Sequence, residues 1–152
     1  MHRYEARIAW QRNGAVFSGN RCSRVHEWSF DGGAKVAASA SPSVVPPRTR
    51  QRKRSIPKKR WWRPSSCQVL WFLSIASKRG FVVESYVDEA FGVMEKKSDG
   101  KLAISRITLR PRIQFSGDRL PSPAELQSLH HSAHDHCLIA NSLKSEVVVE
   151  PG

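Results

Sequence analysis

Two of the three cysteines in the chain stand where a thiol can react. Cys67 follows Ser65 and Ser66 at the start of an apolar segment with helical spacing. A thiol in the first turn of a helix faces unpaired backbone N–H groups, which lower its pKa and raise the thiolate fraction. Cys137 lies 70 residues further on and can resolve an oxidised Cys67 as a disulfide if the two helices pack together. Burial as a small apolar residue is the alternative for each thiol.

A histidine-rich segment precedes Cys137 and is a second candidate for chemistry. His130 and His134 share one helix face at a spacing of four residues, which suits zinc, and Cys137 can add a thiolate. The segment lacks the glutamate of a His-Glu-x-x-His motif and has no second Cys-x-x-Cys pair. An exposed histidine face is therefore the favoured interpretation, and we expect neither a metal nor a cofactor. Cys22 has no visible partner and receives no role.

The elements that must position these residues follow an α+β pattern. Alternating and helical spacings, with Gly, Pro and Asn turn signals between them, predict strands at 4–10, 25–30 and 34–38, a helix at 65–78, long strands at 81–96 and 101–116, a helix from 123 to about 137 or 139, and a strand at 147–149. Ser65 or Ser66 is the expected cap of the first helix, and Ser122 that of the second. The first helix is apolar nearly all round, which predicts a central, buried position.

The charge of the chain is concentrated in one segment. The 152 residues carry a formal net charge of +12, and nine of the 25 basic residues lie between Arg48 and Arg63, where there is no acid. Without those nine charges the chain is at +3. Read alone, the segment indicates a nucleic-acid-binding module in which Trp61 and Trp62 stack on bases, and this is our alternative function. Linear basic runs are nonetheless common in proteins that bind no nucleic acid.

Length and hydropathy exclude further classes. A chain of 152 residues predicts a single domain, 1–152, with a core that needs no disulfide. The longest apolar run, residues 69–76, falls far short of the ~20 residues of a membrane helix. The first residues lack the apolar stretch of a secretory signal. We therefore expect a cytoplasmic protein with no membrane partner.

The contexts of the two cysteines resemble the OsmC/Ohr family of thiol-dependent peroxidases. The resemblance is carried by Ser65-Ser66-Cys67 with Leu70-Trp71-Phe72-Leu73, and by the segment Cys137 to Lys144. The segments 26–33 and 91–96 resemble one OsmC-like subgroup. The similarity covers residues 2–46 and 65–150, which is nearly everything outside the basic segment.

The resemblance implies a fold and a reaction. The implied fold has antiparallel sheets wrapped around two central helices in an intertwined homodimer, with the reactive site at the interface. The implied function is a response to oxidative stress: the Cys67 thiolate reduces an organic hydroperoxide, Cys137 resolves the sulfenic acid, and a dithiol such as a lipoyl group reduces the disulfide. In the family an N-terminal arginine supports the thiolate. Arg21 and Arg24 both remain open, and we take Arg24 as the site residue.

One segment departs from the family. An acidic Asn/Asp-Pro-Glu-Glu-type motif, whose glutamate holds the arginine, is expected about ten residues before Cys67, but residues 48–64 are basic instead. We hypothesise that this segment is translated out of frame, because a one-base shift of permitted codons encodes Val-Asp-Pro-Glu-Glu-Ala at the right spacing. For the chain as written we expect disorder in the segment, a helix shortened by Pro64, and impaired peroxidase activity.

Overall fold

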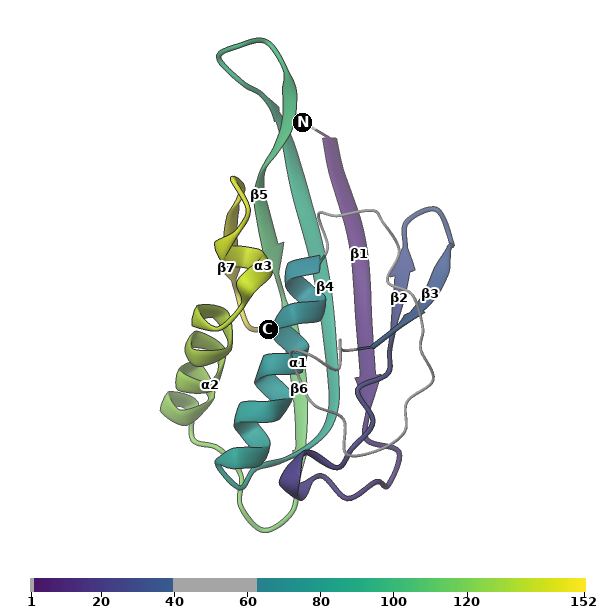
Figure 1. Cartoon of the computed structure of the whole chain (residues 1–152), viewed down its shortest axis with the longest axis vertical. Helices are drawn as coiled ribbons and strands as arrows, with labels where there is room; N and C mark the ends of the chain where they lie inside the picture. Colours follow the sequence, from purple (N-terminus) through teal and green to yellow (C-terminus); the bar gives the residue numbers. More distant parts are fainter. Residues whose placement is uncertain (1, 40–62) are drawn as a thin grey trace.

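The computed structural model describes residues 2–39 and 63–152. It has a mixed α+β architecture in which one sheet carries helices on one face (Figure 1). The elements, in chain order, are β1 (His2–Gln11), a 3-10 turn (Ser18–Asn20), β2 (His26–Phe30), β3 (Lys35–Ala38), α1 (Arg63–Lys78), β4 (Val82–Lys96), β5 (Leu102–Leu109), β6 (Pro111–Ser116), α2 (Pro123–Asp135), α3 (Leu138–Asn141) and β7 (Glu146–Val149).

The seven described strands form one sheet. Their order is β3-β2-β1-β4-β5-β7, and β6 pairs with the first half of β4. All pairings are antiparallel except that of β5 with β7, which is parallel. The expectation of purely antiparallel strands was therefore wrong at the C-terminus. After α3 the chain enters β7, which runs beside β5 in the direction of β5, so the β5–β7 pair is parallel.

The long strand predicted at 101–116 is interrupted at Arg110. Pro111 has no backbone N–H to donate to a ladder. The N–H of Arg110 donates instead to the side chain of Asp88, with 2.7 Å between N and Oδ1. β5 and β6 therefore run along two successive parts of β4, and the interruption faces a buried carboxylate.

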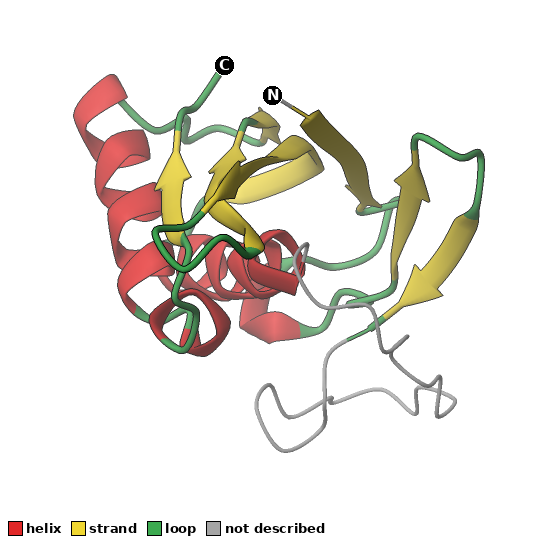
Figure 2. Cartoon of the chain, turned by 90° about the horizontal axis from the view of Figure 1, so that it is seen from above, coloured by secondary structure: helices red, strands yellow, loops and turns green. Residues whose placement is uncertain are grey.

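The three helices cover the same face of the sheet (Figure 2). Alternation along β1 turns Ala6, Ile8 and Trp10 inward and leaves Glu5 and Arg7 exposed. The buried core between sheet and helices includes Ile8, Trp10, Trp28, Val69, Phe72, Leu73, Ala76, Phe81, Tyr86 and Leu129. The predicted central position of the apolar helix is confirmed.

The helix α1 begins two residues before the predicted cap. Pro64 is its second residue, where a missing N–H is tolerated, so Pro64 does not shorten the helix. Ser65 and Ser66 lie inside the first turn and are not caps, which corrects the prediction. At the other end Gly80 has a φ of 79°, and its N–H donates to the Ser77 carbonyl, as the glycine stop predicted.

The second predicted helix is two helices. α2 starts with Ser122 as its cap, as predicted, but ends at Asp135. Cys137 then takes an extended conformation, with φ −75° and ψ 92°, and becomes the N-cap of the four-residue α3. Residue 137 is therefore not in the last turn of a continuous helix: it lies at a break that directs its side chain toward α1.

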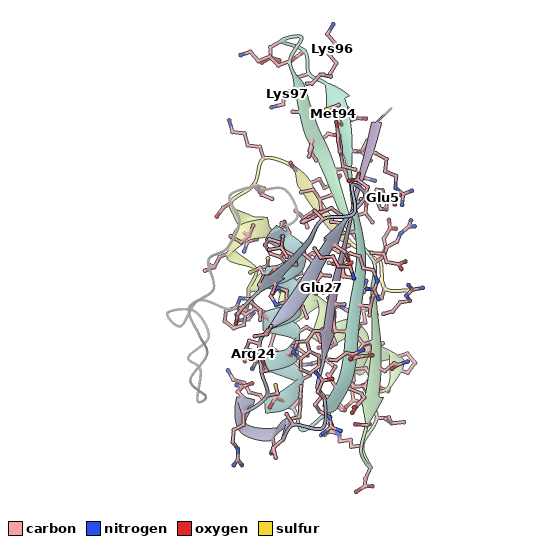
Figure 3. All side chains as sticks on the ribbon, turned by 90° about the vertical axis from the view of Figure 1, so that its right-hand side faces the viewer. Glu5, Arg24, Glu27, Met94, Lys96 and Lys97 are labelled. Carbon is pink, nitrogen blue, oxygen red and sulfur yellow. The ribbon has the colours of Figure 1, made fainter. Side chains whose placement is uncertain are left out.

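Two further findings concern expectations about charge and membranes. Within the described parts of the chain, no helix is long and apolar enough to cross a membrane. The basic segment, the nucleic-acid interpretation and the expected disorder at 48–64 fall almost entirely outside the described residues, which resume at Arg63. The β4–β5 hairpin projects beyond the helices and carries Met94, Lys96 and Lys97 toward its tip (Figure 3).

Candidate functional site

The structure brings Cys67 and Cys137 together. Cys67 is the fifth residue of α1, and Cys137 caps α3, which lies beside the first turns of α1 (Figure 1). The two thiols lie near enough for a hydrogen-bonding interaction that shifts the pKa of both, and all three cysteines are unoxidised. Cys67 is partly exposed, whereas Cys137 is 1% exposed. Cys67 is thus the more accessible of the two thiols.

The environment of Cys67 favours its thiolate. The hydrogen bond from Cys137 lowers the pKa of Cys67 to about 7, burial opposes the shift, and the backbone N–H groups of Ile139 and Leu138 add to it. The expected cause, the N–H groups at the start of the cysteine's own helix, is not the one found. The donors come from α3 because the break at Cys137 leaves its first N–H groups unpaired.

Cys137 has the opposite character. Its hydrogen bond to Cys67, together with burial, raises the pKa of the Cys137 thiol far above its ordinary value. The two shifts oppose each other because ionisation of one thiol disfavours ionisation of its neighbour. The Ala140 N–H donates to Cys137 Sγ over 3.4 Å, and the Cys137 thiol donates to the Pro64 carbonyl oxygen over 3.8 Å. The pair therefore contains a nucleophile and a proton-holding neighbour.

The first turn of α1 is bonded to two strands of the sheet. Ser65 Oγ donates to Asp88 Oδ2 on β4, and Asp88 Oδ1 accepts the Arg110 N–H. Asp88 is fully buried, and burial raises its pKa to about 6 despite these two hydrogen bonds. A carboxyl with a raised pKa in a dry environment is uncommon outside functional sites.

The second bond of this turn joins Ser66 to His26 on β2. His26 Nδ1 lies 3.0 Å from the Arg24 carbonyl oxygen, and its Nε2 lies 2.5 Å from Ser66 Oγ. A carbonyl only accepts, so Nδ1 carries the hydrogen and Nε2 accepts from the serine. Burial lowers the pKa of His26, the bond to Arg24 only partly opposing this, which keeps the ring neutral at pH 7.

Arg24 is buried on the helix side of the sheet but is not at the sulfurs. Its Nη2 donates to Asn20 Oδ1 over 2.7 Å, and Asn20 Nδ2 donates to Ser74 in the second half of α1 (Figure 3). In the described part of the chain Nη1 has no hydrogen-bond partner and no hydrogen bond joins Arg24 to either cysteine. Arg21 is exposed.

The histidine segment gathers no metal-ligand cluster with the other described residues. Among the described residues no group of three or more His, Cys, Asp or Glu side chains could hold a metal ion. His130 is buried against Phe72 with 4.8 Å between ring centroids, and burial lowers its pKa to about 4. His131 is exposed and pairs with Asp135. Burial also raises the pKa of Cys22, although Arg24 opposes this shift.

The site contains residues to which the sequence analysis gave no role. His26 and Asp88 are the clearest cases. Asp88 lies on the same face of β4 as the buried Tyr86 and Ala90. An acidic residue in a row of buried strand positions is a sequence signal by which Asp88 could have been found. His26 alternates with Arg24 and Trp28, which are also buried. Their serine partners are 40 and 23 residues away, so no local pattern predicts the pairing.

Comparison with known proteins gives concordant results. The family model of the OsmC-like protein matches residues 65–151 and so begins directly after the basic segment. An OsmC-like protein of unknown function from Vibrio cholerae is 42% identical over 100% of both chains, with a TM-score of 0.59. No curated protein matches the chain.

Two more distant structures share the fold alone. An OsmC-like protein from Mycoplasma pneumoniae is 12% identical over 95% of this chain and 94% of its own, with a TM-score of 0.51. An OsmC-like hydroperoxide resistance protein from Jannaschia sp. CCS1 is 11% identical over 93% and 87%, with a TM-score of 0.52. Fold and site define an α+β protein with a paired-thiol centre. The chain belongs to the OsmC-like protein family, which confirms the resemblance.

Proposed function

We propose that the protein is a thiol-dependent peroxidase that reduces organic hydroperoxides with Cys67 and Cys137. The observation that carries the proposal is the juxtaposition of the two cysteines at the first turn of α1, where a thiolate-favouring, partly exposed cysteine lies next to a buried thiol. The similarity to a fold neighbour described as a hydroperoxide resistance protein agrees with it.

The reaction follows from the state of each sulfur. The Cys67 thiolate attacks the distal oxygen of the hydroperoxide, the O–O bond breaks, and the departing alkoxide takes a proton to become an alcohol. Cys67 is then a sulfenic acid. The Cys137 sulfur attacks that sulfur, the S–O bond breaks, and the hydroxyl leaves as water with the Cys137 proton. A dithiol such as a lipoyl group reduces the disulfide by exchange.

Further parts of the proposal concern the surroundings of the pair. We propose Arg24 and not Arg21 as the supporting arginine, because Arg24 is buried and bonded through Asn20 to Ser74 of α1, the helix that carries Cys67, while Arg21 is exposed. We also propose a cytoplasmic homodimer, in which a second copy covers the exposed Leu102 and Leu138, which are 66% and 58% exposed. Loss of the acidic motif at 48–64 leaves Arg24 without a described carboxylate partner and would lower activity.

The test is hydroperoxide turnover with three cysteine variants. With cumene hydroperoxide and dihydrolipoamide, Cys67→Ser should abolish turnover. Cys137→Ser should allow one oxidation and leave a sulfenic acid that dimedone traps on Cys67. Cys22→Ser is the matched control and should retain turnover, because Cys22 is buried away from the pair. Turnover that survives Cys67→Ser contradicts the proposal.

A further inference from the structure

The first turn of α1 is held by polar bonds at two consecutive residues. Ser65 is bonded to Asp88 on β4, and Ser66 to His26 on β2. In the sheet these two strands flank β1, so the bonds reach the turn from two different directions. Cys67 is the next residue along the chain.

The groups that make these bonds are mostly buried, and the acceptors are held in place. Ser65, Asp88 and His26 are 0%, 0% and 3% exposed, so water does not compete for the Ser65 hydroxyl, while Ser66 is half-buried and bonds to a buried ring. Each acceptor is itself fixed: His26 by the Arg24 carbonyl, and Asp88 by the Arg110 N–H. An apolar residue at any of the four positions would fill the space without fixing the rotation of the helix.

The geometry that needs fixing is that of the sulfurs. Cys67 must stay beside Cys137 and the Leu138 and Ile139 N–H groups at the α2–α3 junction, which contacts the same turn of α1 through the Cys137 thiol and the Pro64 carbonyl. A rotation of the first turn of α1 carries Cys67 away from these donors. Small displacements of this kind have large effects on reactions between positioned groups.

We propose that His26 and Asp88 are positioning residues of the thiol site, which act through Ser66 and Ser65 to clamp the first turn of α1 and hold the Cys67 sulfur against Cys137. The proposal rests on the proposed function for its biological purpose. Its physical content is independent of peroxide chemistry, because it concerns the distance and orientation of two thiols.

The test uses two measurements that need no peroxide. The pH dependence of Cys67 alkylation by iodoacetamide, in a Cys22→Ser background, reports the thiolate. Oxidation by diamide, an azodicarboxamide that takes two electrons and two protons from a thiol pair, reports how readily the disulfide forms. In Ser66→Ala and Ser65→Ala we expect the alkylation pKa to move upward and disulfide formation to slow about tenfold.

Two controls separate positioning from general stability. Ser77→Ala removes another hydroxyl of α1, one that donates to the Phe17 carbonyl over 3.0 Å at the far end of the helix, and should change neither readout. Ser66→Thr keeps the hydroxyl and should restore both. Since His26 acts through Ser66, His26→Leu and Ser66→Ala should give effects that do not add in the double variant.

The outcomes are distinguishable. If Ser65→Ala and Ser66→Ala behave as Ser77→Ala does, with both readouts unchanged, the clamp is only structural and the proposal is overturned. If the readouts shift as expected while the unchanged chain reduces no hydroperoxide, the clamp stands and the proposed function fails.

Discussion

Replacing His130 with leucine should make the protein more resistant to acid. His130 is 4% exposed, and among the described residues neither ring nitrogen has a hydrogen-bond partner. Burial lowers its pKa from 6.5 to about 4. In the unfolded chain the His130 ring therefore becomes protonated near pH 6.5, whereas in the folded chain it becomes protonated only near pH 4. The contribution that neutral His130 makes to folding stability is fully present above pH 6.5 and is lost as the pH falls toward 4.

The two pKa values give the magnitude. At pH 5 nearly all unfolded molecules and few folded ones carry the proton, which costs about 2 kcal/mol of folding free energy, whereas at pH 7.5 the cost is close to zero. Leucine has no such proton and fits the apolar contact with Phe72. His130→Leu should thus gain about 2 kcal/mol relative to the unchanged chain between pH 7.5 and pH 5.

The assay is urea unfolding of both chains at pH 7.5 and pH 5, at one protein concentration. The quantity of interest is the change in their stability difference, from which pH-independent packing effects cancel. His131→Leu is the matched control, because His131 is the next residue of α2 and is exposed. If His130→Leu and His131→Leu show the same pH dependence, His130 is not buried as described and the reasoning is refuted.

Three further predictions follow from single contacts. Asp88→Asn should show the opposite pH dependence. The pKa of Asp88 is raised to about 6, so its ionisation costs folding stability as the pH rises. Relative to the unchanged chain, the variant should gain about 1.5 kcal/mol between pH 5 and pH 7.5 in the same urea assay. Cys137→Ala should move the alkylation pKa of Cys67 upward from about 7, because it removes the largest cause of the lowered pKa; an unchanged iodoacetamide profile would contradict this. Ser122→Ala breaks the capping box of α2, in which Ser122 Oγ accepts from the Glu125 N–H over 3.2 Å, and should cost about 1 kcal/mol, seen as a lower urea midpoint; no loss would mean that the cap is not formed.

The parts of the fold that the sequence predicted are those with local causes. The apolar spacing of 65–78 and Gly80 are sufficient to reveal α1 and its end, and Ser122 as cap reveals the start of α2. The boundary between the predicted strands at 81–96 and 101–116 also has a local cause, since Gly100 in the turn between them takes a φ of 82°. Each of these signals operates over a few residues, so a single sequence is enough to reveal it.

The errors in the strands and at Cys137 have long-range causes, with one exception. Neither glycine nor proline marks the break at Cys137, which exists because residue 137 turns toward α1, 70 residues earlier in the chain. The parallel pairing of β7 also has no local signal. The interruption at Arg110 is the exception, because Pro111 cannot donate to a ladder and could have been taken as a break.

The contrast between local and long-range causes also explains which parts of the candidate site could be predicted. The pairing of Cys67 with Cys137 came from the family resemblance and from a condition, that the helices pack together, which the structure meets. The cause of the lowered pKa could not be predicted, because its donors belong to a four-residue helix that begins at a break with no glycine or proline to mark it. Each cysteine thus helps to create the environment of the other. A variant of either residue should therefore be judged by the state of its partner, and not only by the loss of one sulfur.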